Sequence, residues 1–328
     1  MTPLSRKILI VHNPAIGTDN LGDEIIMRYC NRVLARCFPF FRYRRIDVPT
    51  HAPVDRRCEE AMKRADLQIV CGTNILCPHV GKYNLWKMEG GVDRSAYRNI
   101  VLLACGWNRY SPGISEESRA LYRSILSRDR LHCVRDAYTE RRMEEMGFRN
   151  VVNTNCVTLW GLSSRRMARI PAGKAPSAVF TLTAHRKDPE RDAFLIETLL
   201  GNYRETFFWP QGNRDKDYFG ELLALSGIPR TKIRVLERSL EAFDGLLDRG
   251  GIDYVGTRLH GGCHALNRGR RALIVALDNR ATEIARDTNL PVVPAEDVAG
   301  TLQERIDARI PVSLRIQRDN IKQWKNQF

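Results

Sequence analysis

The chain has 328 residues, of which 43% are hydrophobic and 27% charged, and its formal net charge is +14. This composition is that of a globular protein and excludes wholesale disorder. No apolar run approaches the roughly 20 residues that a membrane span needs. The 52 basic residues are dispersed and accompany no nucleic-acid-binding motif, so the charge favours a small phosphorylated or acidic partner over nucleic acid.

The N-terminal residues pass from a short basic stretch into a strand-like run, without the features of a signal peptide, and we expect a cytoplasmic protein. The nine cysteines are odd in number and form no CxxC pair, which argues against a disulfide framework. Cys71, Cys77 and His79 resemble part of a zinc site. No second pair of ligands stands nearby at zinc spacing, so we expect packed thiols and no metal.

Apolar runs of strand length alternate with amphipathic stretches of helix length along the whole chain, the pattern of parallel βαβ units. In the first half we expect strands at 7–13, 42–48, 67–72, 99–107 and 131–136, and helices at 24–37, 115–126 and 139–148. Residues 162–176 are basic, rich in proline and small residues, and lack apolar periodicity, which indicates a linker.

The second half repeats this alternation. We expect strands at 177–182, 206–210, 233–237, 253–258 and 272–277, a short strand at 291–294, and helices from about 189, at 215–226 and 239–250, from about 261, after 280, and twice near the end. The prediction is an α/β fold of two Rossmann-like doubly wound domains, 1–165 and 177–328, joined by a linker at 166–176. Such a pair is typical of a glycosyltransferase-B-like architecture with an interdomain cleft.

The segment GTRLHGG (256–262) is the strongest candidate for chemistry. If the strand continues to its end, Arg258 and His260 share one face, while Gly261 and Gly262 leave a helix N-terminus open to an anion. Arg258 would then bind a phosphate or carboxylate, and His260 would transfer a proton. The structural alternative is that Arg258 pairs with a carboxylate and His260 caps the helix.

Other strand ends carry polar residues that could join this site. Arg280 follows the next strand and could supply a second cation, although Asp278 or Asn279 could equally cap the helix there. Arg135 ends the strand at 131–136. On the acceptor side, where sugar hydroxyls would bind, the candidates are Asn20, Asp23, Glu24, Thr73 and Asn74. Helix capping is the alternative role for these residues.

Five segments in this order resemble the polysaccharide pyruvyl transferase family: DNLGDEII (19–26), VCGTNIL (70–76), CVRDAYT (133–139), GTRLHGGCHAL (256–266) and LIVALDNRATEI (273–284). The family transfers the enolpyruvyl moiety of phosphoenolpyruvate onto a sugar, commonly as a cyclic ketal, in polysaccharide and exopolysaccharide biosynthesis. The resemblance implies a glycosyltransferase-B-like fold, with the acceptor on the first domain and the donor on the second.

Carried onto this chain, Arg135 matches the family's donor-binding arginine and His260 its catalytic histidine. Many members have lysine where this chain has Arg280, so a planar fork replaces a compact ammonium. The resemblance implies that Arg135, Arg258, Arg280 and the helix start at Gly261 bind phosphoenolpyruvate as co-substrate, with no cofactor. His260 would be the general acid, and Asp23 or Glu24 the base.

Two rival functions stay open. A nucleotide-sugar-dependent glycosyltransferase of the same fold would use Arg258 and Arg280 for a diphosphate and Glu283 for the ribose, whereas a non-catalytic binder of anionic glycan or nucleic acid would spread its basic residues over an outer face. The C-terminal helix, with Trp324 and Phe328, could contact the inner face of an anionic membrane carrying a lipid-linked oligosaccharide acceptor. It could also pack back on a domain. The sequence predicts no oligomeric state.

Overall fold

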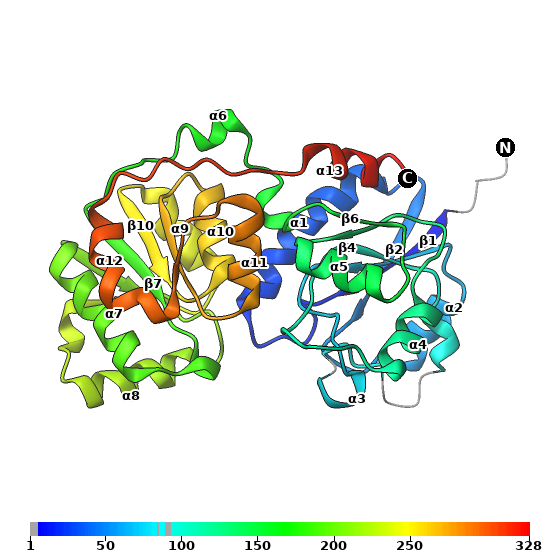
Figure 1. Cartoon of the computed structure of the whole chain (residues 1–328), viewed down its shortest axis with the longest axis horizontal. Helices are drawn as coiled ribbons and strands as arrows, with labels where there is room; N and C mark the ends of the chain where they lie inside the picture. Colours follow the sequence, from blue (N-terminus) through cyan, green and yellow to red (C-terminus); the bar gives the residue numbers. More distant parts are fainter. Residues whose placement is uncertain (1–5, 84, 89–92) are drawn as a thin grey trace. The chain divides into compact units, whose positions relative to one another are not determined.

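The computed structural model describes residues 6–83, 85–88 and 93–328 (Figure 1). They form two compact units, each built on a six-stranded parallel sheet. Unit 1 comprises the described residues up to Thr18, then Ile26–Val157 and Ile316–Phe328, and unit 2 comprises Asp19–Ile25 and Thr158–Arg315. These bounds differ from the two continuous domains expected, because residues 19–25 cluster with unit 2 and residues 316–328 with unit 1.

The sheet of unit 1 has the strand order β2-β1-β3-β4-β5-β6. Its strands are β1 (Lys7–Asn13), β2 (Tyr43–Pro49), β3 (Leu67–Cys71), β4 (Ile100–Cys105), β5 (His132–Val134) and β6 (Val151–Asn153). Every residue of β3 and β4 is buried, as expected for central parallel strands that helices cover on both faces.

The helices of the first half are α1 (Leu21–Cys37), α2 (Arg56–Lys63), α3 (Val80–Tyr83), α4 (Glu116–Ile125) and α5 (Ala137–Glu145). Near the end of the chain, α13 (Arg318–Lys325) packs against β5 of the same unit, with Trp324 fully buried. The C-terminal helix thus follows the second alternative given above and packs back on a domain. Within the described ranges, no helix is long and apolar enough to cross a membrane.

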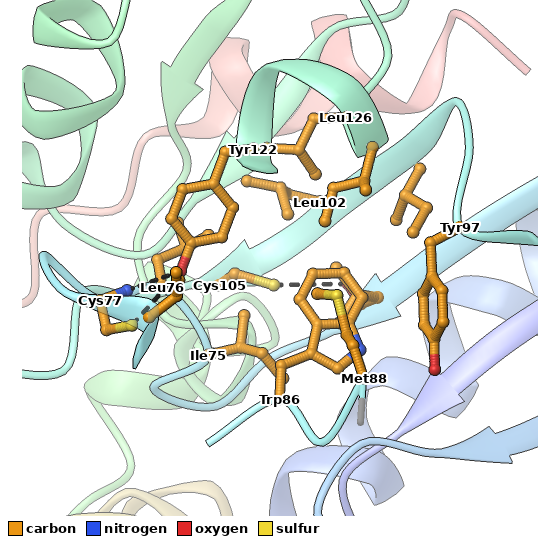
Figure 2. Packing of buried hydrophobic residues seen from close by; sticks show 14 of the residues in the cluster. Ile75, Leu76, Cys77, Trp86, Met88, Tyr97, Leu102, Cys105, Tyr122 and Leu126 are labelled. Carbon is orange, nitrogen blue, oxygen red and sulfur yellow. Dashed lines mark hydrogen bonds between the residues drawn. The ribbon is translucent and has the colours of Figure 1, made fainter. Parts of the chain in front are cut away.

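One face of the sheet in unit 1 is covered by a hydrophobic cluster that α4 completes (Figure 2). The hydroxyl of Tyr122 accepts a hydrogen bond from the backbone N–H of Cys77 at 2.9 Å and lies 3.6 Å from its sulfur. Cys77 therefore packs beneath a helix, while Cys71 ends the buried strand β3. Among the described residues, no group of three or more His, Cys, Asp or Glu is arranged to hold a metal ion.

The sheet of unit 2 has the strand order β12-β11-β10-β7-β8-β9. Its strands are β7 (Ser177–Thr181), β8 (Glu205–Phe208), β9 (Ile233–Val235), β10 (Ile252–Gly256), β11 (Ala272–Ala276) and β12 (Val292–Pro294). All pairs are parallel, so the carboxyl ends of the strands meet at one edge. The central position of β10, between β7 and β11, brings the loops after these three strands together.

The helices of unit 2 are α6 (Ser164–Met167), α7 (Pro189–Asn202), α8 (Asp215–Ser226), α9 (Leu240–Arg249), α10 (Leu259–Asn267), α11 (Asn279–Thr288) and α12 (Val298–Asp307). One face of the sheet packs against α7, α8 and α12. On the other face, Phe243 of α9 stacks on Trp209 with ring centroids 3.9 Å apart. The segment expected as a linker contains α6 and clusters with unit 2.

Candidate functional site

A small pocket lies at the carboxyl edge of the sheet in unit 2. The lining residues come from the loops after β7, β8, β10 and β11 and from the segment before α1, and they are Asn20, Thr183, Gln211, Thr257, Arg258, Leu259, His260, Leu277, Asp278, Arg280 and Ala281. The fold thus gathers Asn20, Arg258, His260 and Arg280, four of the candidates predicted from the sequence.

The strand does not continue through His260, which was the condition for Arg258 and His260 to share one face. Strand β10 ends at Gly256 and helix α10 begins at Leu259, with Arg258 as its N-cap. A Cβ atom on Gly256 would lie 2.6 Å from the backbone nitrogen of Thr181, so only glycine permits this approach of β7 to β10. His260 is therefore the second residue of a helix and does not share a strand face with Arg258.

The two glycines of α10 also have a different role from the one expected. A Cβ atom on Gly262 would lie 2.6 Å from Cδ1 of Ile274, and one on Gly261 would lie 3.1 Å from the Tyr254 ring. These glycines let the helix pack directly on the sheet. The helix start nevertheless suits an anion, because the Arg258 side chain makes no capping hydrogen bond to the first turn.

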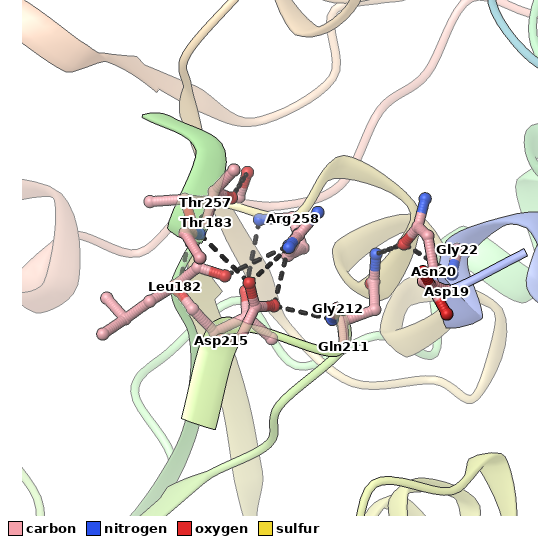
Figure 3. A network of polar contacts seen from close by, with 12 residues as sticks. Asp19, Asn20, Gly22, Leu182, Thr183, Gln211, Gly212, Asp215, Thr257 and Arg258 are labelled. Carbon is pink, nitrogen blue, oxygen red and sulfur yellow. Dashed lines mark hydrogen bonds and ion pairs between the residues drawn. The ribbon is translucent and has the colours of Figure 1, made fainter. Parts of the chain in front are cut away.

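Arg258 forms a buried ion pair with Asp215 (Figure 3). Its Nε donates to Oδ2 of Asp215 at 3.1 Å, and its Nη2 donates to Oδ1 of the same carboxylate. The carboxylate also accepts hydrogen bonds from the backbone N–H groups of Gly212, at 2.7 Å, and Ala184, at 3.1 Å. The alternative role for Arg258, pairing with a carboxylate, is thus realised, and its guanidinium is fixed at the pocket wall.

The backbone of Arg258 is held as firmly as its side chain. Tyr254 donates its hydroxyl to the Arg258 carbonyl at 2.6 Å, and the Arg258 N–H donates to Oγ1 of Thr181 at 3.2 Å. The Thr181 and Tyr254 hydroxyls are themselves 2.6 Å apart. Burial raises the pKa of the Tyr254 phenol above its usual range, so the hydroxyl stays a neutral donor.

Arg280 is held in the same way by its own carboxylate. Asp278 is the N-cap of α11 and binds Nε of Arg280 at 3.0 Å and Nη2 at 2.6 Å. Burial opposes the charge, but Asp278 and Asp23 outweigh it, so the pKa of Arg280 lies above its usual value. Asp278 therefore caps the helix and also orients the second cation.

Arg258 and Arg280 each bind their carboxylate through Nε and Nη2. Within the part of the chain that the structure describes, no residue accepts a hydrogen bond from Nη1 of Arg258 or of Arg280. Each cation thus keeps a donor available to a ligand while its charge is balanced by a neighbour. The pocket is consequently less cationic than its arginines alone suggest.

Two residues at this edge were missed by the sequence reasoning. The buried side chain of Gln211 follows β8 and donates from Nε2 to Oδ1 of Asn20 at 2.9 Å, and no described residue bonds its Oε1. His185 follows β7; burial, and then repulsion by Arg258 and Arg280, lowers its pKa to about 4. Both residues follow strand ends, the position that pointed to Arg258 and Arg280.

The acceptor-side candidates before and within α1 belong to unit 2. Asn20 accepts a hydrogen bond from the Gly22 N–H at 3.0 Å and donates to Asp23 at 3.5 Å. Asp23 is buried and contributes to the potential at Arg280, whereas Glu24 is exposed on the first turn. Asn20 and Asp23 therefore lie near the pocket, with Asn20 in its wall.

Arg135, Thr73 and Asn74 lie in unit 1. Arg135 is 2% exposed, and its guanidinium donates to Asp136 at 2.9 Å, to the Trp107 carbonyl at 3.1 Å and to Oδ1 of Asn74. Asp136 also caps α5 through the Thr139 N–H. The structure thus unites Arg135 with Asn74 at the carboxyl edge of the sheet in unit 1.

Comparisons with known proteins agree with these motifs. The sequence profile of the polysaccharide pyruvyl transferase family matches residues 20–279. None of the curated protein sequences matches the chain. The fold is similar to that of Staphylococcus aureus MnaA in complex with UDP, at 12% identity and a TM-score of 0.56, over 98% of both chains.

Two further solved structures extend this similarity. A putative UDP-N-acetylglucosamine 2-epimerase from Listeria monocytogenes is 10% identical with a TM-score of 0.55, covering 98% of this chain and 91% of the other. The Neisseria meningitidis UDP-GlcNAc 2-epimerase bound to UDP-GlcNAc is 11% identical with a TM-score of 0.51, covering 92% and 94%. With the two parallel sheets, these similarities confirm the glycosyltransferase-B-like fold class predicted from the sequence.

Proposed function

Because the chain belongs to the polysaccharide pyruvyl transferase family, we propose that it transfers the pyruvyl group of phosphoenolpyruvate onto a sugar as a ketal. The acceptor would be a sugar of a cell-surface polysaccharide or of its lipid-linked precursor, modified at the cytoplasmic face of the membrane. The observation that carries this proposal is the convergence of Arg258, His260 and Arg280 on one pocket beside a helix start.

Phosphoenolpyruvate carries a phosphate and a carboxylate, which match the donors of this pocket. The free Nη1 groups of Arg258 and Arg280 would bind these anions, together with the N–H groups of the first turn of α10, which includes Gly261. The paired carboxylates Asp215 and Asp278 keep both guanidinium planes oriented before the substrate arrives. Their charge also limits how tightly the released phosphate is held.

The proposed chemistry needs one acid and one base. His260 protonates the methylene carbon of phosphoenolpyruvate, and an acceptor hydroxyl attacks the adjacent carbon as cationic character develops there. A second hydroxyl then displaces the phosphate and closes the ketal. Asp23 or Glu24 would take the hydroxyl protons, and Oε1 of Gln211 would accept a hydrogen bond from the sugar.

Three residues of unit 1 are proposed substrate contacts. Arg135 is proposed for the donor because its segment resembles the one that carries the family's donor-binding arginine, and Thr73 and Asn74 present a hydroxyl and an amide at the same edge of their sheet. Since Arg135 holds Asn74 directly, the two side chains would act together.

Transfer is tested by incubating the protein with phosphoenolpyruvate and candidate acceptor glycans, while phosphate release is followed. The modified sugar should gain the mass of pyruvate less one water. His260→Ala should lower turnover by about 10²–10⁴-fold and leave the unfolding transition unchanged. Turnover near that of the wild type in this variant would remove His260 from the mechanism.

A nucleotide-sugar-dependent glycosyltransferase is the second candidate, favoured by the fold similarity to proteins solved with UDP or UDP-GlcNAc. This function needs a carboxylate for the ribose, for which Glu283 is the candidate. Glu283 is 1% exposed and already binds Arg286 at 2.7 Å, which disfavours that role. Binding of UDP-GlcNAc without binding of phosphoenolpyruvate would establish this candidate instead.

A further inference from the structure

Two adjacent phenylalanines project from unit 1 in the loop between α1 and β2. Phe40 is 81% exposed and Phe41 67%, and their rings meet edge to face with centroids 6.0 Å apart. Burying an exposed apolar side chain is favourable by about 1.5–3 kcal/mol. Such a pair on a surface marks a contact with an apolar partner.

The loop that carries this pair is well anchored. Phe38, one residue before Pro39, is buried between Tyr43 and Phe328, with ring centroids 5.2 Å and 4.7 Å away. The Arg42 N–H donates to the Pro39 carbonyl at 2.9 Å. Phe40 and Phe41 are therefore held outward by a fixed turn.

Basic residues lie on the segments that adjoin the phenylalanines. Five exposed cations come from the loop, from the end of α1, and from the starts of β1 and β2 with the residue before β1, and they are Arg6, Lys7, Arg36, Arg42 and Arg44. Nη1 of Arg6 donates to the Phe40 carbonyl at 3.3 Å, and the Lys7 N–H donates to the Arg42 carbonyl at 3.0 Å. No acidic residue occurs between 36 and 46, and Asp47 is already bound by Arg45.

We infer that this surface, Phe40 and Phe41 with these five cations, docks the protein on an anionic lipid bilayer. Aromatic side chains insert at the boundary of the acyl chains, while arginine and lysine bind the negative headgroups. A second copy of the chain fits less well, because two such surfaces would bring like charges together. Single-stranded nucleic acid needs a groove that follows its backbone, whereas these residues stand on a projecting turn.

The position of the turn in the fold supports this role. The loop feeds the start of β2 and thus lies at the amino edge of the sheet in unit 1. Arg135 and Asn74 follow β5 and β3, at the carboxyl edge of the same sheet. A membrane bound at the amino edge would therefore lie at the opposite end of the strands from those residues.

This surface replaces the C-terminal helix as the membrane contact considered from the sequence. Trp324 and Phe328 suggested a membrane role for the C-terminal helix, but Trp324 is fully buried and packs on Phe328, which also packs on Phe38. Docking goes beyond the proposed transfer reaction, since it concentrates the protein where lipid-linked acceptors are found.

Vesicle binding tests the inference. Wild-type protein should sediment with vesicles of phosphatidylcholine and phosphatidylglycerol, but not with phosphatidylcholine alone. Each inserted phenylalanine should raise partitioning about tenfold or more, and each cation near the surface about fivefold. Phe40→Ser with Phe41→Ser, and Arg42→Glu with Arg44→Glu, should each abolish sedimentation, and added salt should weaken the wild type.

Matched controls come from unit 2. Leu225→Ser removes another highly exposed apolar side chain, and Arg230→Glu reverses another exposed cation; both should sediment like the wild type. Phosphate release with a soluble acceptor should be unchanged in the double variants. That readout separates failure of docking from failure of the proposed reaction.

Three results would overturn the inference. The first is no sedimentation of wild type with anionic vesicles, or undiminished sedimentation of either double variant. The second is a wild-type dimer, seen by light scattering, that the serine double variant converts to a monomer, which would assign the surface to a second copy. The third is binding of single-stranded RNA that is tighter than vesicle binding and lost in the same variants.

Discussion

Asp215 binds the guanidinium of Arg258 with both carboxylate oxygens, although the two residues are 43 positions apart in the sequence. Asp215 is fully buried at the start of α8, and Arg258 is 8% exposed at the start of α10. The pair therefore joins two helix starts at the edge of one sheet. The ion pair holds the guanidinium of Arg258 in place at the proposed donor site.

Removing the carboxylate should destabilise unit 2. Asp215→Ala leaves the buried Arg258 without its counter-charge and two backbone N–H groups without their acceptor, so the free energy of unfolding should fall by about 3–5 kcal/mol. Urea unfolding measures the change. Asp217→Ala, an exposed aspartate in the same turn of α8, should stay within about 0.5 kcal/mol of the wild type. Equal stability of the two variants would show that the ion pair contributes nothing.

The packing of α10 on the sheet predicts a second stability effect. A Cβ atom on Gly262 would lie 2.6 Å from Cδ1 of Ile274 and closer still to its Cγ1. Gly262→Ala should lower the free energy of unfolding by about 1–3 kcal/mol. Gly220 of α8 has open space around its Cβ position, so Gly220→Ala should stabilise by about 0.5–1 kcal/mol. Thermal unfolding measures both changes. A Gly262→Ala variant that is more stable than Gly220→Ala would contradict the predicted clash between α10 and the sheet.

The sequence predicted the central sheets because their strands are uniformly apolar, as in β4. Helix α2 was missed, since only Met62 among its residues is buried and charged residues fill most of its length. The sequence predicted that the helix after β10 begins at about residue 261, whereas α10 begins at Leu259. Its N-cap is Arg258, and no Ser, Thr, Asp or Asn there signals a helix start.

The sequence predicted the site residues that follow the ends of strands, but it did not predict the residues that contact them. Arg258, His260 and Arg280 were found because they follow strands whose carboxyl ends meet at one edge. Asp215 and Gln211 were not found, since each follows the end of β8 and only the folded sheet brings them beside β10. Asp278 was correctly expected as a possible helix cap, but only the folded chain shows that it also binds Arg280.

Buried histidines should make the fold acid-sensitive. Burial lowers the pKa of His132 to about 4, and its ring accepts from the Leu102 N–H at 3.2 Å and donates to the Ser127 carbonyl at 2.8 Å. Burial lowers the pKa of His12 to about 4 as well. As the unfolded value is about 6.5, the unfolded chain binds more protons between these limits, and the free energy of unfolding falls as the pH falls.

As the pH falls from about 7 to about 4, each of these two histidines should lower the free energy of unfolding by about 3 kcal/mol. Urea unfolding of the wild type and of His132→Asn at about pH 7 and about pH 5 measures it, and the variant should lose less stability between the two. An equal pH dependence in the two proteins would mean that His132 titrates normally in the fold.

The central claim is that the pocket of unit 2 binds phosphoenolpyruvate. Titration calorimetry with this ligand tests it most directly, using the wild type, Arg280→Met, and Arg230→Met as an exposed control in the same unit. We predict saturable binding to the wild type and the control, and binding weaker by about tenfold or more in Arg280→Met, which loses a charged hydrogen-bond donor. Absence of binding to the wild type, or equal affinity in Arg280→Met, would contradict the claim.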